Sequence, residues 1–213
     1  MYLLDDQFWF PPQHLADESG LLAIGGDLSP ERLLLAYKNG IFPWYNAGQP
    51  ILWHSPDPRM VLFPSALKVS KSMRQLLRKE LFEVTINKAF EKVIRACSGI
   101  PRAGQEATWI TDDMIAAYIK LHELGHAVSV EVWQEEQLVG GLYGIDLPEQ
   151  KVFCGESMFS TVSNASKVGF ITWVQQLQEQ NYKLIDCQVY TEHLASLGAD
   201  EIYRTAFLEY LKV

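Results

Sequence analysis

Cysteine is scarce in this chain, which has only three among its 213 residues: Cys97, Cys154 and Cys187. Three cysteines cannot all pair, and their spacing matches no metal-ligand pattern, so the sequence favours neither a disulfide framework nor a cysteine metal site. Unpaired cysteines are typical of a reducing compartment. We interpret all three as small core residues.

The sequence also lacks a long apolar run, a low-complexity tract and an internal repeat. No stretch approaches the roughly 20 apolar residues that span a membrane, and MYLLDDQFWFPP (1–12) is not a basic leader followed by an apolar segment. We therefore expect a cytoplasmic protein with no membrane partner. The length suits one large domain, or a domain of about 150 residues with a smaller one attached.

An excess of positive charge is missing as well. The formal net charge is −8, which argues against a nucleic-acid partner because phosphate contacts need Lys and Arg. The charge is uneven, however, at +1 over residues 1–111 and −9 over residues 112–213, and eight basic residues between positions 68 and 95 face only three acidic ones. Such a patch allows an acidic protein to grip RNA locally. A solvated helix face is the alternative interpretation.

The first sixty residues are rich in Pro, Gly and aromatic residues and contain one clear helix. Ser29 is its predicted N-cap, Pro30 takes the first helical position, and Gly40 ends it. The segment closes with WHSPDPR (53–59), whose prolines suit a rigid linker.

Strands and helices mix from residue 59 onward. The patterns predict strands over residues 59–63, 82–86, 128–134, 138–145, 151–159 and 183–190. They predict helices over residues 69–79, 86–97, 111–124 and about 163–180, followed by a short helix and a terminal helix. The order of two helices, three antiparallel strands, helix, strand and helix resembles the GNAT-type acyltransferase fold. We therefore expect an α+β protein with a mixed, largely antiparallel sheet.

The motif HELGH (122–126) matches the H-E-x-x-H signature of zinc proteases. That site needs both histidines one turn apart on a continuous helix. Here Gly125 is a predicted helix terminator, His126 begins the next strand, and no third ligand follows at a suitable spacing. We interpret the motif as a helix C-terminus with two ordinary histidines and expect no metal.

Two acids interrupt otherwise apolar predicted strands. In LIDCQV, strand alternation puts Asp186 and Gln188 side by side on one face. In FCGESMFS, the same rule puts Cys154, Glu156 and Met158 on one face. Acids in apolar strands are costly unless they are paired or functional, so Glu156 and Asp186 are the best catalytic or cation-binding candidates. Structural hydrogen bonding is the alternative.

Three tryptophans stand near predicted loops, where they could stack on a nucleobase: Trp44, Trp53 and Trp109. Any one tryptophan is more often a core residue. The GNAT-like order also raises acetyl-CoA as a donor, which such enzymes hold with a glycine-rich turn at a helix N-terminus. The corresponding turn here, STVSNASK (160–167), has no glycine. The CoA hypothesis therefore loses its main support.

Several blocks in order resemble the leucyl/phenylalanyl-tRNA-protein transferase family, and the resemblance runs from about residue 10 to 210. The blocks are GLLAIGGDLSPERLLLAYKNGIFPWY (20–45), PILWHSPDPR (50–59), TWIT (108–111), LHELGHAVSVEVW (121–133), LVGGLYG (138–144), FCGESMFS (153–160), NASK (164–167), LIDCQ (184–188) and HLASLGADEI (193–202).

This resemblance implies a small N-terminal α/β domain over residues 1–62 and a GNAT-like catalytic domain over residues 63–213. It implies transfer of Leu or Phe, with Met as a minor donor, from tRNA to the N-terminal Arg or Lys of a protein, which marks that protein for degradation. No metal, CoA or ATP is implied, because the aminoacyl ester is already activated.

The resemblance also implies roles for individual residues. Asp186 and Gln188 would be the catalytic pair beside the acceptor amine, with Asp186 either removing the amine proton or orienting the amine. Glu156 would hold or polarise the substrates. Trp44 and Trp109 match tryptophans that contact the terminal adenosine of tRNA.

Two larger groups of residues would bind the donor. The Leu or Phe side chain would enter an apolar pocket that includes Phe153, Met158, Phe170 and Ile185. The acceptor-stem phosphates would meet the basic helix through Lys68, Lys71, Arg74, Arg78 and Lys79.

The chain departs from the family pattern in a few places. His54 stands where a second tryptophan is usual, Ala107 replaces a glycine, and the segment 98–106 is longer than the usual joint. Val128 replaces a polar residue, and Tyr203 replaces a proline. These departures leave the donor preference and tRNA affinity open, and the sequence does not indicate the oligomeric state.

Two other functions remain open from the sequence. One is an aminoacyl-tRNA-dependent transferase with another acceptor, such as a cell-wall peptide. The other is a catalytically silent module that binds tRNA or a degron.

Overall fold

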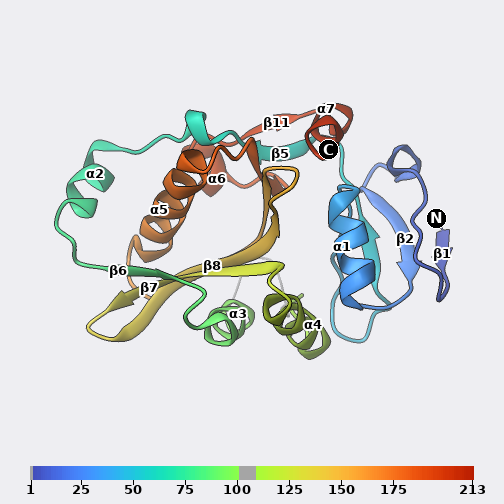
Figure 1. Cartoon of the computed structure of the whole chain (residues 1–213), viewed down its shortest axis with the longest axis horizontal. Helices are drawn as coiled ribbons and strands as arrows, with labels where there is room; N and C mark the ends of the chain where they lie inside the picture. Colours follow the sequence, from blue (N-terminus) through green and yellow to red (C-terminus); the bar gives the residue numbers. More distant parts are fainter. Residues whose placement is uncertain (1, 101–108) are drawn as a thin grey trace.

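The computed structural model describes residues 2–100 and 109–213 and contains two β-sheets, which lie side by side (Figure 1). The smaller sheet has the order β1-β2-β4-β3, with β1 (Tyr2–Leu4), β2 (Leu21–Gly25), β3 (Phe42–Pro43) and β4 (Leu52–His54). The larger sheet has the order β11-β5-β10-β9-β8-β7-β6, with β5 (Arg59–Leu62), β6 (Glu83–Ile86), β7 (Ala127–Gln134), β8 (Gln137–Leu147), β9 (Val152–Ser160), β10 (Leu184–Gln188) and β11 (Asp200–Ile202).

Neighbouring strands run antiparallel except for the β1–β2 and β9–β10 pairs, which are parallel. The predicted α+β class with a mixed, largely antiparallel sheet is therefore confirmed. The predicted order of two helices, three antiparallel strands, helix, strand and helix is also confirmed along the larger sheet.

Helices cover both faces of the larger sheet. The α-helices are α1 (Pro30–Lys38), α2 (Lys71–Leu77), α3 (Phe90–Ser98), α4 (Asp112–Glu123), α5 (Ala165–Glu179), α6 (Glu192–Ser196) and α7 (Arg204–Tyr210), and short 3-10 turns occupy Gln13–Leu15 and Pro64–Ala66. The α3 and α4 helices lie on one face and α5 on the other (Figure 1). Among the described residues, no helix combines the length and the apolar character required to cross a bilayer.

The capping residues explain several helix boundaries. The Ser29 hydroxyl accepts a hydrogen bond from the Arg32 backbone N–H at the start of α1, as predicted. The Thr111 hydroxyl accepts one from Met114 N–H at the start of α4. The α2 helix is shorter than predicted at both ends, since its N-cap is Ser70 and it ends at Leu77. The α3 helix begins at Phe90 rather than at residue 86.

The polypeptide passes from the smaller sheet to the larger one between β4 and β5. Because β5 pairs with β10 and β11, the change of sheet comes a few residues before the domain boundary predicted at residue 62. One of the apolar clusters of the core runs across the junction and contains side chains of both sheets, including Trp53 and Val61. Whether the two parts are independent domains stays a prediction.

The C-terminal helix packs against this junction. Gly40, which follows α1, has a φ of +69° and lies so close to Phe207 and Leu208 of α7 that a Cβ there would meet their side chains at 2.9 and 2.8 Å. Arg204 of α7 donates from its backbone N–H to Asp57 and from its guanidinium to the Ser55 carbonyl oxygen. The α7 helix therefore fixes how the linker enters the larger sheet.

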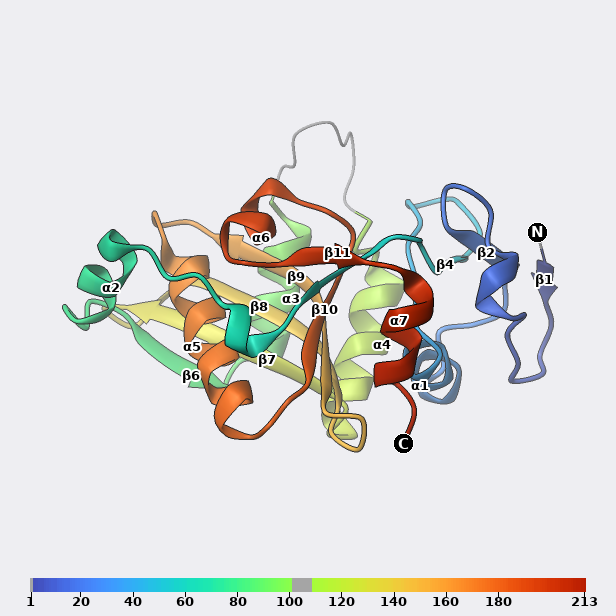
Figure 2. The same ribbon diagram turned by 90° about the horizontal axis from the view of Figure 1, so that it is seen from above.

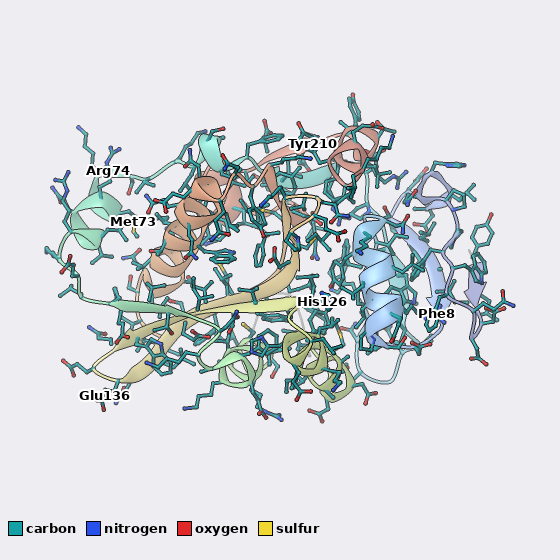
Figure 3. All side chains as sticks on the ribbon, in the orientation of Figure 1. Phe8, Met73, Arg74, His126, Glu136 and Tyr210 are labelled. Carbon is teal, nitrogen blue, oxygen red and sulfur yellow. The ribbon has the colours of Figure 1, made fainter. Side chains whose placement is uncertain are left out.

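The basic residues predicted to bind phosphate lie at one end of the molecule. Lys68, Lys71, Arg74, Arg78 and Lys79 are exposed on α2 and its flanks. Figures 1 and 2 place α2 at the end of the larger sheet that lies away from the smaller sheet. Figure 3 shows Arg74 pointing outward from that end. Met73, on the same helix, is buried instead.

Candidate active site

A cavity opens where the ladder between β9 and β10 stops. Their last paired residues are Cys154 and Asp186, although β9 continues to Ser160 and β10 to Gln188. The space beyond that point has a volume of about 440 Å³, within the range of small-molecule sites. It is lined by Phe42, Pro43, Trp44, Trp109, Leu142, Tyr143, Phe153, Gly155, Glu156, Ser157, Met158, Phe170, Ile185, Cys187, Gln188, Val189, Thr191, His193 and Leu194.

Two irregularities in the ladders set the positions of Glu156 and Gln188. On β9, the register with β8 jumps from Gly155 to Ser157, which leaves Glu156 as an extra residue in the strand. On β10, the register with β5 jumps from Asp186 to Gln188, and Gln188 has a φ of 65°. Bulges of this kind re-aim side chains. Here they bring Glu156 and Gln188 into contact across the gap.

The β9 bulge makes one sequence prediction wrong. Alternation predicted Cys154, Glu156 and Met158 on the same face, but Cys154 belongs to the core on the α3–α4 side and Met158 packs with the core on the α5 side. The extra residue at Glu156 reverses the alternation. This reversal brings Met158 onto the cavity wall together with Phe153.

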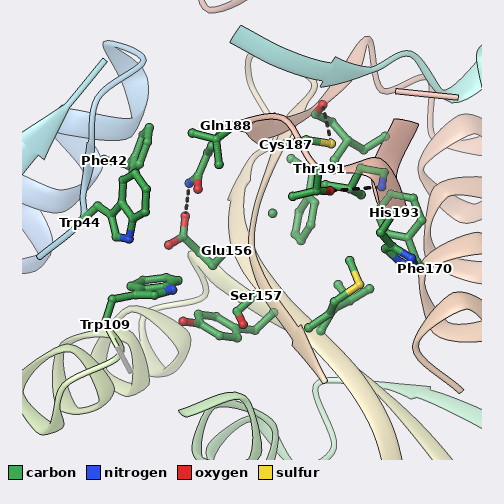
Figure 4. A pocket seen from close by; sticks show the side chains of 18 of the residues that line it. Phe42, Trp44, Trp109, Glu156, Ser157, Phe170, Cys187, Gln188, Thr191 and His193 are labelled. Atoms are coloured by element: carbon green, nitrogen blue, oxygen red, sulfur yellow. Dashed lines mark hydrogen bonds between the residues drawn. The ribbon is translucent and has the colours of Figure 1, made fainter. Parts of the chain in front are cut away.

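The Glu156 carboxylate is buried and accepts two hydrogen bonds. Gln188 Nε2 donates to its Oε1 at 2.7 Å, and the Tyr118 hydroxyl donates to its Oε2 at 3.1 Å (Figure 4 shows the Gln188 contact). Burial raises the pKa of Glu156 to about 7, although the hydrogen bonds from tyrosine and Gln188 act in the opposite direction. Glu156 is therefore a carboxyl group that titrates near neutral pH.

Asp186 lies behind the cavity rather than on its wall. Arg59 donates from Nε and Nη2 to the two carboxylate oxygens of Asp186, at 2.8 and 2.6 Å, and both side chains are 1% exposed. The backbone N–H of Gln188 also donates to Asp186 Oδ1, at 3.0 Å. Asp186 thus contacts the backbone of Gln188, while the side-chain amide of Gln188 contacts Glu156.

Figure 4 shows Trp44 and Trp109 at one end of the cavity and Phe170 at the other. Trp44 and Trp109 line one end, near the smaller sheet and α4. Trp44 is 38% exposed, whereas Trp109 is 7% exposed. The four predicted side-chain pocket residues also line the cavity: Phe153, Met158, Phe170 and Ile185.

The third tryptophan is part of the core. Trp53 is fully buried, and its indole N–H donates to the Gly25 carbonyl oxygen at 2.8 Å. His54, which stands where a second tryptophan was expected, packs edge-on to Trp44 with 5.6 Å between ring centroids. Burial lowers the pKa of His54, which favours the neutral ring.

The two histidines of HELGH do not share one helix, because α4 ends at Glu123 and Gly125 has a φ of +83°. His122 stacks on Phe90, and its Nδ1 lies 2.8 Å from the Ala127 carbonyl oxygen. No cluster of three or more potential metal ligands occurs within residues 2–100 and 109–213.

The other departures from the family pattern lie in different parts of the structure. Val128 is buried in the core on the α5 side, and Tyr203 is 78% exposed. Ala107 and most of the segment 98–106 lie outside the described residues.

Three buried residues at the site were not predicted: Arg59, Tyr37 and Tyr118. Each tyrosine interrupts the apolar face of its helix, which is a detectable signal for a buried polar contact. Their partners are remote in sequence, however, since Tyr37 bonds Tyr118 across 81 positions and Arg59 bonds Asp186 across 127. A single sequence does not reveal such pairs.

Comparison with known proteins gives consistent matches over the whole chain. Residues 61–212 match the family model described as leucyl/phenylalanyl-tRNA protein transferase, and residues 26–57 match the N-terminal domain of the same family. A leucyl/phenylalanyl-tRNA–protein transferase of Christiangramia forsetii is 61% identical, covering 99% of this chain and 100% of the relative. The enzyme of the same name from Flavobacterium johnsoniae is 62% identical, covering 100% and 99%.

The solved structures that resemble this protein are more distant in sequence. The structure of L-PGS from Bacillus licheniformis is 14% identical with a TM-score of 0.43, covering 94% of this chain and 68% of that one. A GCN5-related N-acetyltransferase from Kribbella flavida is 11% identical with a TM-score of 0.37, covering 81% and 60%.

The raised pKa of Glu156 predicts a pH-dependent stability. The pKa rises from 4.5 to about 7 on folding, so the folded state binds more protons between these values and stability falls as pH rises through them. Relative to a Glu156→Gln variant, the wild type should lose up to about 3 kcal/mol between pH 4.5 and pH 8. Urea unfolding of both proteins at several pH values measures this difference. A constant difference would contradict the burial of an ionisable group here.

Proposed function

Because this chain belongs to the leucyl/phenylalanyl-tRNA–protein transferase family, we propose that the cavity between β9 and β10 is where it carries out its reaction. The protein is an aminoacyltransferase that moves an amino acid from tRNA to the N-terminus of a protein. The observation that carries the proposal is the contact between Glu156 and Gln188 on the wall of this cavity.

The cavity suits the 3′ end of an aminoacyl-tRNA. The terminal adenine stacks on Trp44 and Trp109. A stacking contact between a base and an aromatic side chain is worth roughly 1–3 kcal/mol. The side chain of Leu or Phe enters the apolar end, which is lined by Phe153, Met158 and Phe170. Because apolar pockets distinguish single methylenes only weakly, unbranched Met fits as a minor donor. β-branched Val and Ile are excluded by their shape.

The reaction needs little acid or base strength. The acceptor amine attacks the ester carbonyl, a C–N bond forms, and the C–O bond to the ribose breaks. The proton lost by the amine balances the proton that the ribose oxygen gains. An α-amino group has a pKa of about 7.7–8.0, so a useful fraction is neutral at cellular pH. The protein therefore contributes mainly position and orientation.

Gln188 and Asp186 have separate roles in this proposal. The carbonyl oxygen of the Gln188 side chain accepts a hydrogen bond from the acceptor amine and directs its lone pair at the ester. Asp186 is already bonded to Arg59 and to the Gln188 backbone. It therefore positions Gln188 rather than removing the amine proton.

Glu156 favours an acceptor that begins with Arg or Lys. Among the described residues it has no ion-pair partner, whereas Arg59 neutralises Asp186. An unpaired buried carboxylate attracts a cation. Adding Leu or Phe to such an N-terminus would create a signal for degradation of the acceptor.

The exposed basic residues around α2 hold the tRNA phosphates. They lie at the end of the larger sheet away from α1 (Figure 2), so a stem whose 3′ end occupies the cavity would cross the molecule to reach them. Contacts of this kind attract RNA without reading its bases.

The acceptor rule can be tested directly. The purified protein is incubated with labelled Leu-tRNA and a peptide beginning with Arg, beside the same peptide beginning with Ala. We expect label on the Arg peptide alone, because only this N-terminus complements Glu156. Equal labelling of both peptides would contradict the preference for an N-terminal Arg or Lys. Intact Leu-tRNA with no transfer would contradict the proposed reaction.

The contribution of the basic residues can be measured by salt dependence. Replacing Lys71 and Arg74 with Ala should reduce the slope of log affinity for Leu-tRNA against log salt by about 1.5, since each lost phosphate contact reduces it by roughly 0.7–0.9. The matched control replaces Lys183 and Lys212, which are also exposed, and should leave the slope unchanged. Equal slopes for all three proteins would place the phosphate contacts elsewhere.

A further inference from the structure

Glu156 stands at the end of a chain of buried hydrogen bonds that begins beside the smaller sheet. The Tyr37 hydroxyl on α1 bonds the Tyr118 hydroxyl on α4, and Tyr118 donates to Glu156 Oε2. Gln188 Nε2 donates to the other carboxylate oxygen. All four side chains are buried. The two parts of the protein are therefore connected by polar contacts that end at the cavity.

The hydrogen bonds of this chain have one consistent direction when Glu156 is ionised. A carboxylate only accepts, so the Tyr118 proton points to Glu156 and Tyr37 donates to the Tyr118 oxygen. The amide nitrogen of Gln188 must face Glu156 for the same reason. The amide oxygen of Gln188 is then directed away from Glu156.

A protonated Glu156 would allow a different arrangement. A carboxylic acid can donate one hydrogen bond, which would allow Gln188 to turn its amide and present its oxygen to Glu156. The amide nitrogen, a donor, would then face the acceptor amine. The amide N–H would then donate to the lone pair of the neutral amine, which is the pair that must attack the ester, so this arrangement would oppose the reaction.

We propose that Tyr118, supported by Tyr37, is a positioning residue that keeps Glu156 as an acceptor on both oxygens and so keeps the Gln188 carbonyl turned toward the acceptor amine. The inference rests on the proposed function of Gln188 and adds the device that orients it. Neither tyrosine is among the residues that line the cavity. Their effect on the reaction passes through Glu156.

Several groups around this series of hydrogen bonds influence the charge of Glu156. They are Tyr37 on α1, Tyr118 on α4, Gln188 and Asp186 on β10, Arg59 on β5 beside Asp186, and Tyr143 on β8, whose ring lies 5.7 Å from that of Tyr118. Burial raises the pKa of Glu156 and the hydrogen bonds from tyrosine oppose that rise, while the Asp186 charge adds to it. Removing the Tyr118 hydroxyl should therefore raise this pKa further.

The experiment compares the wild type with Tyr118→Phe, which keeps the ring and removes the donor. Initial rates of transfer from Leu-tRNA to the Arg peptide are followed from pH 6 to pH 9. The acid limb of kcat should move up by about one to two pH units, so the rate falls roughly tenfold near pH 7 and recovers toward pH 9. The KM for Leu-tRNA should not change. Tyr37→Phe should shift the limb in the same direction, because the Tyr37 hydroxyl also lowers the pKa of Glu156.

Tyr182→Phe is the matched control. Tyr182 also donates from a partly buried hydroxyl to a carboxylate, that of Asp146, at 2.6 Å, but neither residue lines the cavity. This variant should keep the wild-type pH profile even where its stability falls. A Tyr118→Phe profile parallel to that of the wild type would overturn the proposal, because a merely structural loss lowers the rate equally at every pH.

A second measurement does not depend on activity. The pH dependence of unfolding, taken as the difference between each protein and its Glu156→Gln derivative, reports the pKa of Glu156. In the Tyr118→Phe background this pKa should lie higher, and an unchanged value would overturn the inference. If Tyr118→Phe does not fold, the same comparison in Tyr37→Phe decides. Failure of the proposed function would differ from both results, since the wild type itself would then transfer nothing.

Discussion

Arg59 and Asp186 form a buried ion pair behind the cavity, where the smaller sheet, the larger sheet and α7 meet. Arg59 begins β5, and Asp186 lies on β10 just before the bulge that carries Gln188. The guanidinium also donates to the Gly40 carbonyl oxygen and lies between the rings of Phe42 and Phe207, 4.8 and 4.6 Å from their centroids. The pair thus joins the smaller sheet, the larger sheet and α7.

Burying such an ion pair costs free energy. Removing only one of its two charged side chains costs more, because the other charge is then left buried and unpaired. Taking two charges out of water is offset only when the geometry is good and the remaining donors and acceptors are satisfied. Here two parallel hydrogen bonds, a carbonyl oxygen and two aromatic faces meet that condition. Through its bond to the Gln188 backbone, the pair anchors the end of β10, from which the Gln188 side chain reaches Glu156 across the gap. The proposed reaction depends mainly on how the Gln188 side chain is positioned beside the acceptor amine.

Much of the fold could be predicted from periodicity and capping. The N-cap at Ser29 and the alternating strands around the central hairpins follow local rules that the structure obeys. The site was predicted less completely, because its geometry depends on two bulges. Strand alternation assumes that no bulge interrupts the strand, so the sequence did not indicate the extra residue at Glu156. Arg59, Tyr37 and Tyr118 were missed because their partners lie far away in the sequence.

The most direct test of this account is the coupling free energy between Arg59 and Asp186, measured by urea unfolding of Arg59→Met, Asp186→Asn and the double variant. Each single change should cost about 3–5 kcal/mol, because it leaves the partner charge buried and unpaired. The double variant should cost clearly less than the sum of the two, since neither charge then remains. Additive costs would contradict the account, because the two residues would then stabilise the protein independently.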